Sequence, residues 1–171
     1  EEINTDRKTD FMVVLNEGKP SRYGLLKSWV LDKFDNVDIY GKWLDKRTET
    51  DERFKGSLHI NEIQDKLQDV KFTFIIPIKK GWVTAKFWEM AHYGIIPFLH
   101  PTYDEQNNLN YPEFIKVKDA KDLFEKIEYL ENNKDVYDSL RKEISDMIKN
   151  EYYDGSYLND ISIKTIKELT I

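Results

Sequence analysis

Lys86 and Glu89 stand three residues apart at the start of an expected helix over 85–93, so they share one of its faces. Thr84 precedes them and can cap this helix. The backbone at a helix N-terminus favours anions, and a lysine adds positive charge, which suits a diphosphate. A neighbouring carboxylate can accept hydrogen bonds from both hydroxyls of a ribose. The residues therefore indicate a nucleotide site, and the competing interpretation is a surface salt bridge on an amphipathic helix.

A second group of candidates lies in the loop NEGKPSR, which leads into another expected helix. Gly18 lets backbone N–H groups approach a phosphate, and Lys19 and Arg22 supply positive charge. The loop matches neither GxGxxG nor GxxxxGK[ST]. An ordinary turn with solvated charges explains these residues equally well.

A third candidate is the segment GSLHINEIQ, an apolar loop before a short helix. Its backbone N–H and C=O groups can meet the edge of a base, with Leu58 or His59 lying against the ring. A lone histidine in a loop is more often structural or solvated, so the backbone is the stronger candidate. His100 also follows an expected strand at the ligand-facing end, without a visible partner.

The composition excludes several classes of site. The 171 residues contain no cysteine, carry a formal net charge of −6, and show no metal-ligand spacing, Asp-x-Asp motif or Gly-x-Ser-x-Gly motif. The acidic balance argues against nucleic-acid or membrane binding by the whole chain. No apolar run approaches the ~20 residues that cross a bilayer. We expect a cytoplasmic protein with no metal, no other cofactor and no membrane partner.

Strands that alternate with helices through the first two-thirds predict an α/β, Rossmann-like three-layer domain with a parallel sheet of about six strands and a helical C-terminal segment. Ligands bind at the carboxyl ends of such strands. Gly94 is expected to cap the helix over 85–93, Asp119 to cap a later helix, and Pro97 to lie on a sheet edge. The expected strands are 11–15, 37–40, 54–58, 72–76, 95–99 and a marginal one at 114–117, and the expected helices are 22–34, 60–67, 85–93, 119–133, 134–152 and 156–169.

This pattern divides the chain into three parts. Residues 11–151 are expected to form the nucleotide-binding domain, and residues 1–10 a linker. Residues 152–171 are expected to form a C-terminal helix. Because the first residue is not methionine, we expect the chain to be a fragment of a longer polypeptide.

The stretch WVTAKFWEMAHYGIIPFL resembles the nucleotide-binding half of GT-B-fold glycosyltransferases in the spacing of Glu89, Gly94 and Pro97, although its Gly-to-Pro gap is one residue longer than in the commonest version. A closer resemblance is to the C-terminal half of phage DNA β-glucosyltransferases, which transfer glucose from UDP-glucose to hydroxymethylated cytosine. It covers residues 11–151, with VVLNEG, DIYGK, GSLHINEI, FTFIIP and VTAKFWEM in the same order.

The resemblance implies a role for each candidate residue. Glu89 would bind the ribose, and Lys86 would stand where the family has a pyrophosphate-binding arginine, replacing a bidentate fork with a point charge. Leu58 and its neighbours would contact uracil through their backbone. Lys19 and Arg22 would replace a pair of arginines. The catalytic base and the acceptor site would come from an N-terminal domain outside this chain, so the catalytic residues are unknown.

The implied function is the donor-binding domain of a metal-independent glycosyltransferase that uses a UDP-sugar, with UDP-glucose as the expected donor and phage DNA modification as the expected setting. The host cytoplasm would then be its location. Its partners would be UDP or the UDP-sugar and an acceptor domain of the same polypeptide, on which the helix over 152–171 would pack. A DNA acceptor would not be bound through this domain. Two alternatives are a GT-B-type nucleotide-sugar epimerase domain and a non-catalytic Rossmann-like interaction module.

Overall fold

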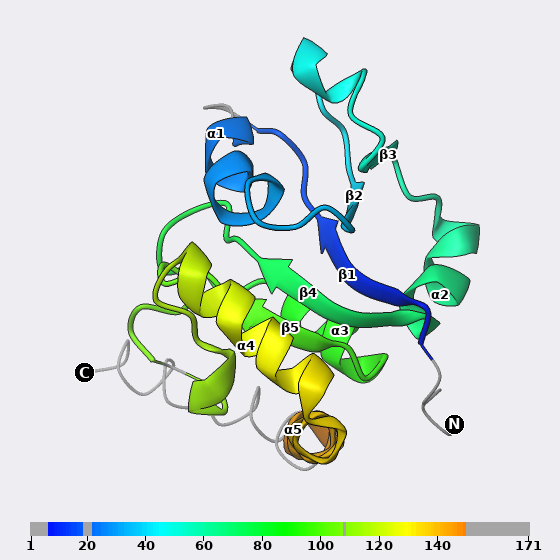
Figure 1. Cartoon of the computed structure of the whole chain (residues 1–171). Helices are drawn as coiled ribbons and strands as arrows, with labels where there is room; N and C mark the ends of the chain where they lie inside the picture. The colour runs from blue at the N-terminus through cyan, green and yellow to red at the C-terminus, as the bar shows by residue number, and fades with distance from the viewer. Residues whose placement is uncertain (1–6, 19–21, 108, 150–171) are drawn as a thin grey trace, which may run out of the picture.

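The computed structural model describes residues 7–18, 22–107 and 109–149, which form an α/β domain around a parallel sheet (Figure 1). The described residues make five strands in the order β3-β2-β1-β4-β5. β1 is therefore the central strand and pairs with β2 and β4 on its two sides. The strands are β1 Thr9–Val14, β2 Asp38–Tyr40, β3 Phe54–Gly56, β4 Val70–Ile75 and β5 Ile96–Leu99.

Helices cover both faces of this sheet, which explains why its central strands are continuous apolar runs. Successive residues of β1 point to opposite faces: Phe11 and Val13 belong to the larger core cluster, and Met12 to the smaller one. The larger cluster includes residues of α1 and α4, and the smaller one includes Leu67 of α2. The α-helices are α1 Tyr23–Leu26, α2 Ile60–Gln68, α3 Lys86–His92, α4 Ala120–Asn132 and α5 Lys134–Met147.

The expected sixth strand is absent from the described residues. Glu113–Ile115 form a 3-10 turn, η3, and the segment meets β5 only through one bridge between Leu99 and Lys116. Ile115 and Lys116 donate their backbone N–H groups locally, to Pro112 O and Glu113 O, and only Val117 N bonds to β5, at Leu99 O over 3.2 Å, so no continuous ladder forms. The prediction of about six strands is therefore one too high.

The helix expected over 22–34 changes its winding part-way. After α1 the chain continues as a π-helical segment, η1 Lys27–Leu31, in which Asp32 N donates to Lys27 O over 3.0 Å. The wider turn keeps Val30 and Leu31 buried. A further 3-10 turn, η2 Lys46–Thr48, follows β2.

Several local expectations are confirmed. Gly94 ends α3 with φ +69°, and the Asp119 carboxylate accepts a hydrogen bond of 2.9 Å from Asp122 N at the start of α4. Pro97 lies on β5, at one edge of the described sheet. The helix expected over 152–171 lies outside the described residues. Within the part of the chain described here, no helix is long and apolar enough to span a membrane.

Candidate functional site

The loop after β1 is tied to the loop after β2 by main-chain and side-chain hydrogen bonds. Glu17 N donates to Lys42 O over 3.0 Å, and the buried Glu17 carboxylate accepts from Leu44 N over 2.6 Å. Gly18 follows with φ +71°, a conformation in which glycine is unstrained. This loop is therefore held in shape at the carboxyl end of the central strand, where parallel sheets bind ligands. Lys19 lies outside the described residues.

Arg22 connects this loop to the neighbouring strand. Its guanidinium donates to Ile76 O over 3.3 Å and to Pro77 O over 2.5 Å, just beyond the end of β4. Burial lowers the pKa of Arg22 from its ordinary value. A half-buried positive charge is thus fixed by backbone carbonyl groups at the end of the sheet.

Lys86 reaches the same edge from α3. Its ammonium group donates a hydrogen bond to Val14 O, the last carbonyl of β1. Burial is the main cause that lowers the Lys86 pKa, the positive charge of Arg22 lowers it further, and Glu89 acts in the opposite direction. The structure therefore brings together Arg22, Lys86 and Glu89.

None of these three charged side chains has an ion-pair partner among the described residues. The side chain of Glu89 is exposed and makes no hydrogen bond to any of the described residues. Two neighbouring cations without a carboxylate between them repel each other, and a bound anion would relieve that repulsion. The arrangement suits a phosphate group next to a hydrogen-bond acceptor.

Thr84 does not cap α3 with its side chain, and this expectation is corrected. The N-cap residue is Ala85, without a side-chain cap, and Thr84 O accepts from Phe87 N over 3.2 Å. The Thr84 backbone is held instead by the buried Tyr103, whose hydroxyl accepts from Thr84 N over 3.0 Å and donates to Thr84 O over 3.1 Å. Sequence reasoning missed Tyr103, which positions the start of the helix that carries Lys86 and Glu89.

The segment expected to meet a base follows β3. Gly56 O accepts from Gly41 N over 2.8 Å, which fixes its start beside β2. Leu58 is half-buried and packs against the smaller core cluster, whereas the His59 side chain is exposed. His59 O accepts from Glu62 N over 2.9 Å at the start of α2. The backbone of this segment is thus held at the carboxyl edge of the sheet, and its contact with a base stays a prediction.

His100 is a neutral packing residue at the end of β5. Its ring centroid lies 4.7 Å from that of Trp29 and 6.0 Å from that of Phe74, and Nδ1 is 2.8 Å from Thr102 Oγ1. Burial lowers the pKa of His100 to about 4. The site thus gains no positive charge from His100 at neutral pH.

This histidine makes stability depend on pH. Between pH 6.5 and about 4 the unfolded chain binds a proton that folded His100 does not, so the free energy of unfolding should fall as the pH is lowered through this window. Urea denaturation at a series of pH values measures this slope. A His100→Gln variant should show a shallower slope, and parallel curves for the two proteins would contradict the assignment.

Comparisons with known proteins identify the fold. No protein-family model and no curated protein matches the sequence. Solved structures do: T4 phage β-glucosyltransferase in complex with UDP-glucose has a TM-score of 0.76 and 14% identity, over 94% of this chain and 49% of that one. The chain has the fold of this glucosyltransferase. It spans about half the length of the phage enzyme.

Two further structures extend the comparison. The phage enzyme in complex with UDP and Mn²⁺ also has a TM-score of 0.76 and 14% identity, over 95% of this chain and 49% of that one. The catalytic domain of cholesterol-α-glucosyltransferase from Helicobacter pylori has a TM-score of 0.62 and 18% identity, over 85% of this chain and 99% of that one. The predicted resemblance to a GT-B glycosyltransferase fold is confirmed at the level of structure.

Proposed function

We propose that this chain is the donor-binding domain of a glycosyltransferase that uses a UDP-sugar, with UDP-glucose as the donor. The observation that carries the proposal is the meeting of Arg22 and Lys86, two cations from different elements with no carboxylate partner in the described ranges, beside the unpaired Glu89. The fold supports it, because one solved structure of the phage enzyme holds UDP-glucose and another holds UDP.

Each residue has a distinct role in this proposal. Lys86 and Arg22 bind the diphosphate and stabilise the charge that builds up on UDP as the bond to the sugar breaks. The exposed Glu89 carboxylate accepts hydrogen bonds from the ribose hydroxyls. Gly18 and Lys19 add backbone N–H groups and a further charge, and the backbone around Leu58 and His59 meets the uracil edge.

We propose that transfer needs no metal, because the two cations do the electrostatic work that a divalent ion would do. Among the described residues there is no group of three or more His, Cys, Asp or Glu side chains that could hold a metal ion. A structure of the phage enzyme holds Mn²⁺ together with UDP. Binding should therefore be measured with and without manganese.

The acceptor and the catalytic base belong to a second domain in this proposal, because the chain corresponds to about half of the phage enzyme. The phage protein is described as a DNA-modifying enzyme. By analogy, a hydroxymethylated base in DNA is the proposed acceptor, bound outside this domain. This chain alone would bind the donor and transfer little sugar.

Isothermal titration with UDP and with UDP-glucose tests donor binding. We expect the wild-type chain to bind both, and Glu89→Ala to bind about tenfold more weakly or worse, since a hydrogen bond to a charged group contributes roughly 1.5–3 kcal/mol. Glu143→Ala removes an exposed carboxylate of α5 that has no ion-pair partner in the described ranges, and it should bind like the wild type. Absence of binding by the wild type, or equal binding by all three proteins, would refute the proposal.

Two other functions are separated by simple measurements. An epimerase domain would change the stereochemistry of a UDP-sugar without an acceptor, which product analysis detects. A non-catalytic interaction module is favoured by the hydrogen bond between Lys86 and Val14 O, because that lysine is partly satisfied within the domain. The Glu89 carboxylate has no ion-pair partner among the residues that the structure describes, which opposes this second alternative. The titration above decides between the interaction module and donor binding.

A further inference from the structure

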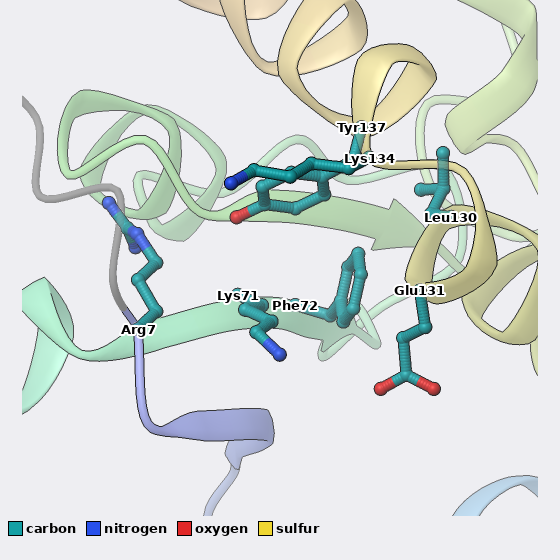
Figure 2. A pocket seen from close by; sticks show the side chains of 7 residues that line it. All are labelled: Arg7, Lys71, Phe72, Leu130, Glu131, Lys134 and Tyr137. Atoms are coloured by element: carbon teal, nitrogen blue, oxygen red, sulfur yellow. The ribbon is translucent and has the colours of Figure 1, made fainter.

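A second charged cavity lies at the opposite edge of the sheet, where β1 and β4 begin (Figure 2). Its volume is about 240 Å³, several times the ~30 Å³ share of one water molecule. Three parts of the chain form its walls: the residue pair at the start of β4, the junction of α4 and α5, and the segment before β1. The lining side chains are Arg7, Lys71, Phe72, Leu130, Glu131, Lys134 and Tyr137.

The lining has an excess of positive charge. Arg7 is only 6% exposed, and its guanidinium donates to the carbonyl oxygens of Leu67, Val70 and Tyr93, so the charge is fixed in position. Lys134 is exposed and has no ion-pair partner among the described residues. In an acidic protein, such a concentration of cations at one cavity favours an anionic ligand.

Two carboxylates, those of Asp10 and Glu131, balance part of this charge at the other side of the cavity. Lys71 forms an ion pair with Asp10. The Glu131 carboxylate points away from the hydroxyl of Tyr137 and from the ammonium of Lys134 (Figure 2). The Glu131 carboxylate therefore does not lie between Arg7 and Lys134 (Figure 2).

Tyr137 supplies the observation that points to a ligand. The residue is 8% exposed, and its hydroxyl proton has no acceptor among the described residues. The guanidinium of Arg141 lies near this hydroxyl, but it can only donate hydrogen bonds and so cannot accept that proton. Figure 2 shows this hydroxyl directed into the cavity, beside Lys134 and toward Arg7. Burial raises the pKa of Tyr137, so the hydroxyl is protonated and able to donate at neutral pH. A buried donor left unsatisfied is costly, and a bound acceptor would remove that cost.

The N-terminus of α5 adds partial positive charge to the side of the cavity where Lys134 lies. Asn133 is the N-cap residue, and its side chain makes no cap hydrogen bond. The free N–H groups of the first turn and the partial positive charge of this 14-residue helix therefore face the region of Lys134. Phe72, whose ring centroid is 5.5 Å from that of Tyr137, and Leu130 form the apolar wall.

We propose that this cavity binds a phosphate-type anion, either free or as the monoester group of a small molecule, with the Tyr137 hydroxyl and the Lys134 ammonium as direct donors. Arg7 contributes fixed positive charge, and the apolar wall accommodates a small organic body. The site is separate from the donor site, because it lies at the amino ends of the strands rather than at their carboxyl ends. It does not depend on the proposed glycosyltransferase function.

Titration of the full chain followed by two-dimensional amide NMR tests this site, with inorganic phosphate and phenyl phosphate as the two ligands, in a phosphate-free buffer. We expect saturable shifts of the amides of residues 130–137. Tyr137→Phe should weaken binding about tenfold or more, since it removes one hydrogen bond to a charged group. Tighter binding of phenyl phosphate than of inorganic phosphate would identify an organic monoester as the ligand, and equal affinities would identify the free ion.

Two control variants make the result specific. Lys142→Gln changes an exposed lysine of the same helix that pairs with Asp146, and it should leave binding at residues 130–137 unchanged. Lys86→Gln removes phosphate binding at the donor site only, so it should also leave these shifts unchanged. Absence of saturable shifts, or equal affinity of the wild type and a folded Tyr137→Phe variant, would overturn the proposal.

Discussion

A Gly41→Ala substitution should lower the free energy of unfolding by about 3 kcal/mol or more, because backbone strain and overpacking each cost roughly 1–3 kcal/mol. Gly41 follows β2 with φ +146°, where side chains are rarely found. A Cβ at this position would lie 2.1 Å from Leu15 O and 2.7 Å from Leu15 C. These are backbone atoms of the central strand's end, so the clash cannot be relieved by rotating a side chain.

The same substitution should disturb the donor site. Gly41 N donates to Gly56 O, and Leu15 N donates to Tyr40 O, so these two hydrogen bonds hold the ends of three neighbouring strands together. Pushing Leu15 away from Gly41 would move the loop that leads to Gly18. We therefore expect weaker UDP binding as well as lower stability in Gly41→Ala.

Gly24→Ala is the matched control, measured in the same chemical denaturation experiment. A Cβ at Gly24, within α1, meets nothing within 4 Å, and alanine favours the helix. This variant should be as stable as the wild type or more stable by about 0.5–1 kcal/mol. Equal stability of the two alanine variants would show that the contact at Gly41 is not a constraint on the fold.

Local sequence signals predicted most of the architecture. The apolar runs of β1 and β4 identify strands covered on both faces, and Gly94 and Asp119 mark helix ends, because each of these signals depends on residues close in sequence. The apolar composition of 114–117 predicts a strand, whereas Pro112 and Glu113 accept the N–H groups of Ile115 and Lys116 in a tight turn and only Val117 N bonds to β5. The π-helical winding of η1 had no signal in the helical spacing of its apolar residues.

The candidate site was predictable where it depends on one helix. The spacing of Lys86 and Glu89 places both on α3, and the structure adds that Lys86 reaches β1, 72 residues earlier in the sequence. Such long-range contacts leave no local pattern. Tyr103 was missed for the same reason, since its hydroxyl holds Thr84 across 19 residues from a loop that looked only polar. These residues meet because all the strands are parallel, so the loops that follow β1, β4 and β5 lie at the same edge of the sheet.

Lys86→Met should leave the stability of the domain nearly unchanged while it weakens UDP binding. The folded-state pKa of Lys86 is lowered, chiefly by burial and then by Arg22. Carrying this charge therefore costs folding free energy at every pH below the lowered pKa, and the cost disappears only above the ordinary value of 10.5. Methionine removes the charge and keeps the chain length. The lost hydrogen bond to Val14 O offsets part of the gain, so the free energy of unfolding should change by less than about 1 kcal/mol at neutral pH.

UDP affinity, in contrast, should fall by about tenfold or more in Lys86→Met, since a charge-assisted hydrogen bond to phosphate is lost. Isothermal titration and urea denaturation of the same preparations measure both quantities. Lys86→Arg is the informative companion, because its bidentate fork should keep or improve binding where methionine removes it. If Lys86→Met bound UDP as well as the wild type, Lys86 would be a structural lysine satisfied by Val14 O. A tenfold loss of affinity without a loss of stability would instead show that the domain keeps a costly buried charge for an anionic ligand.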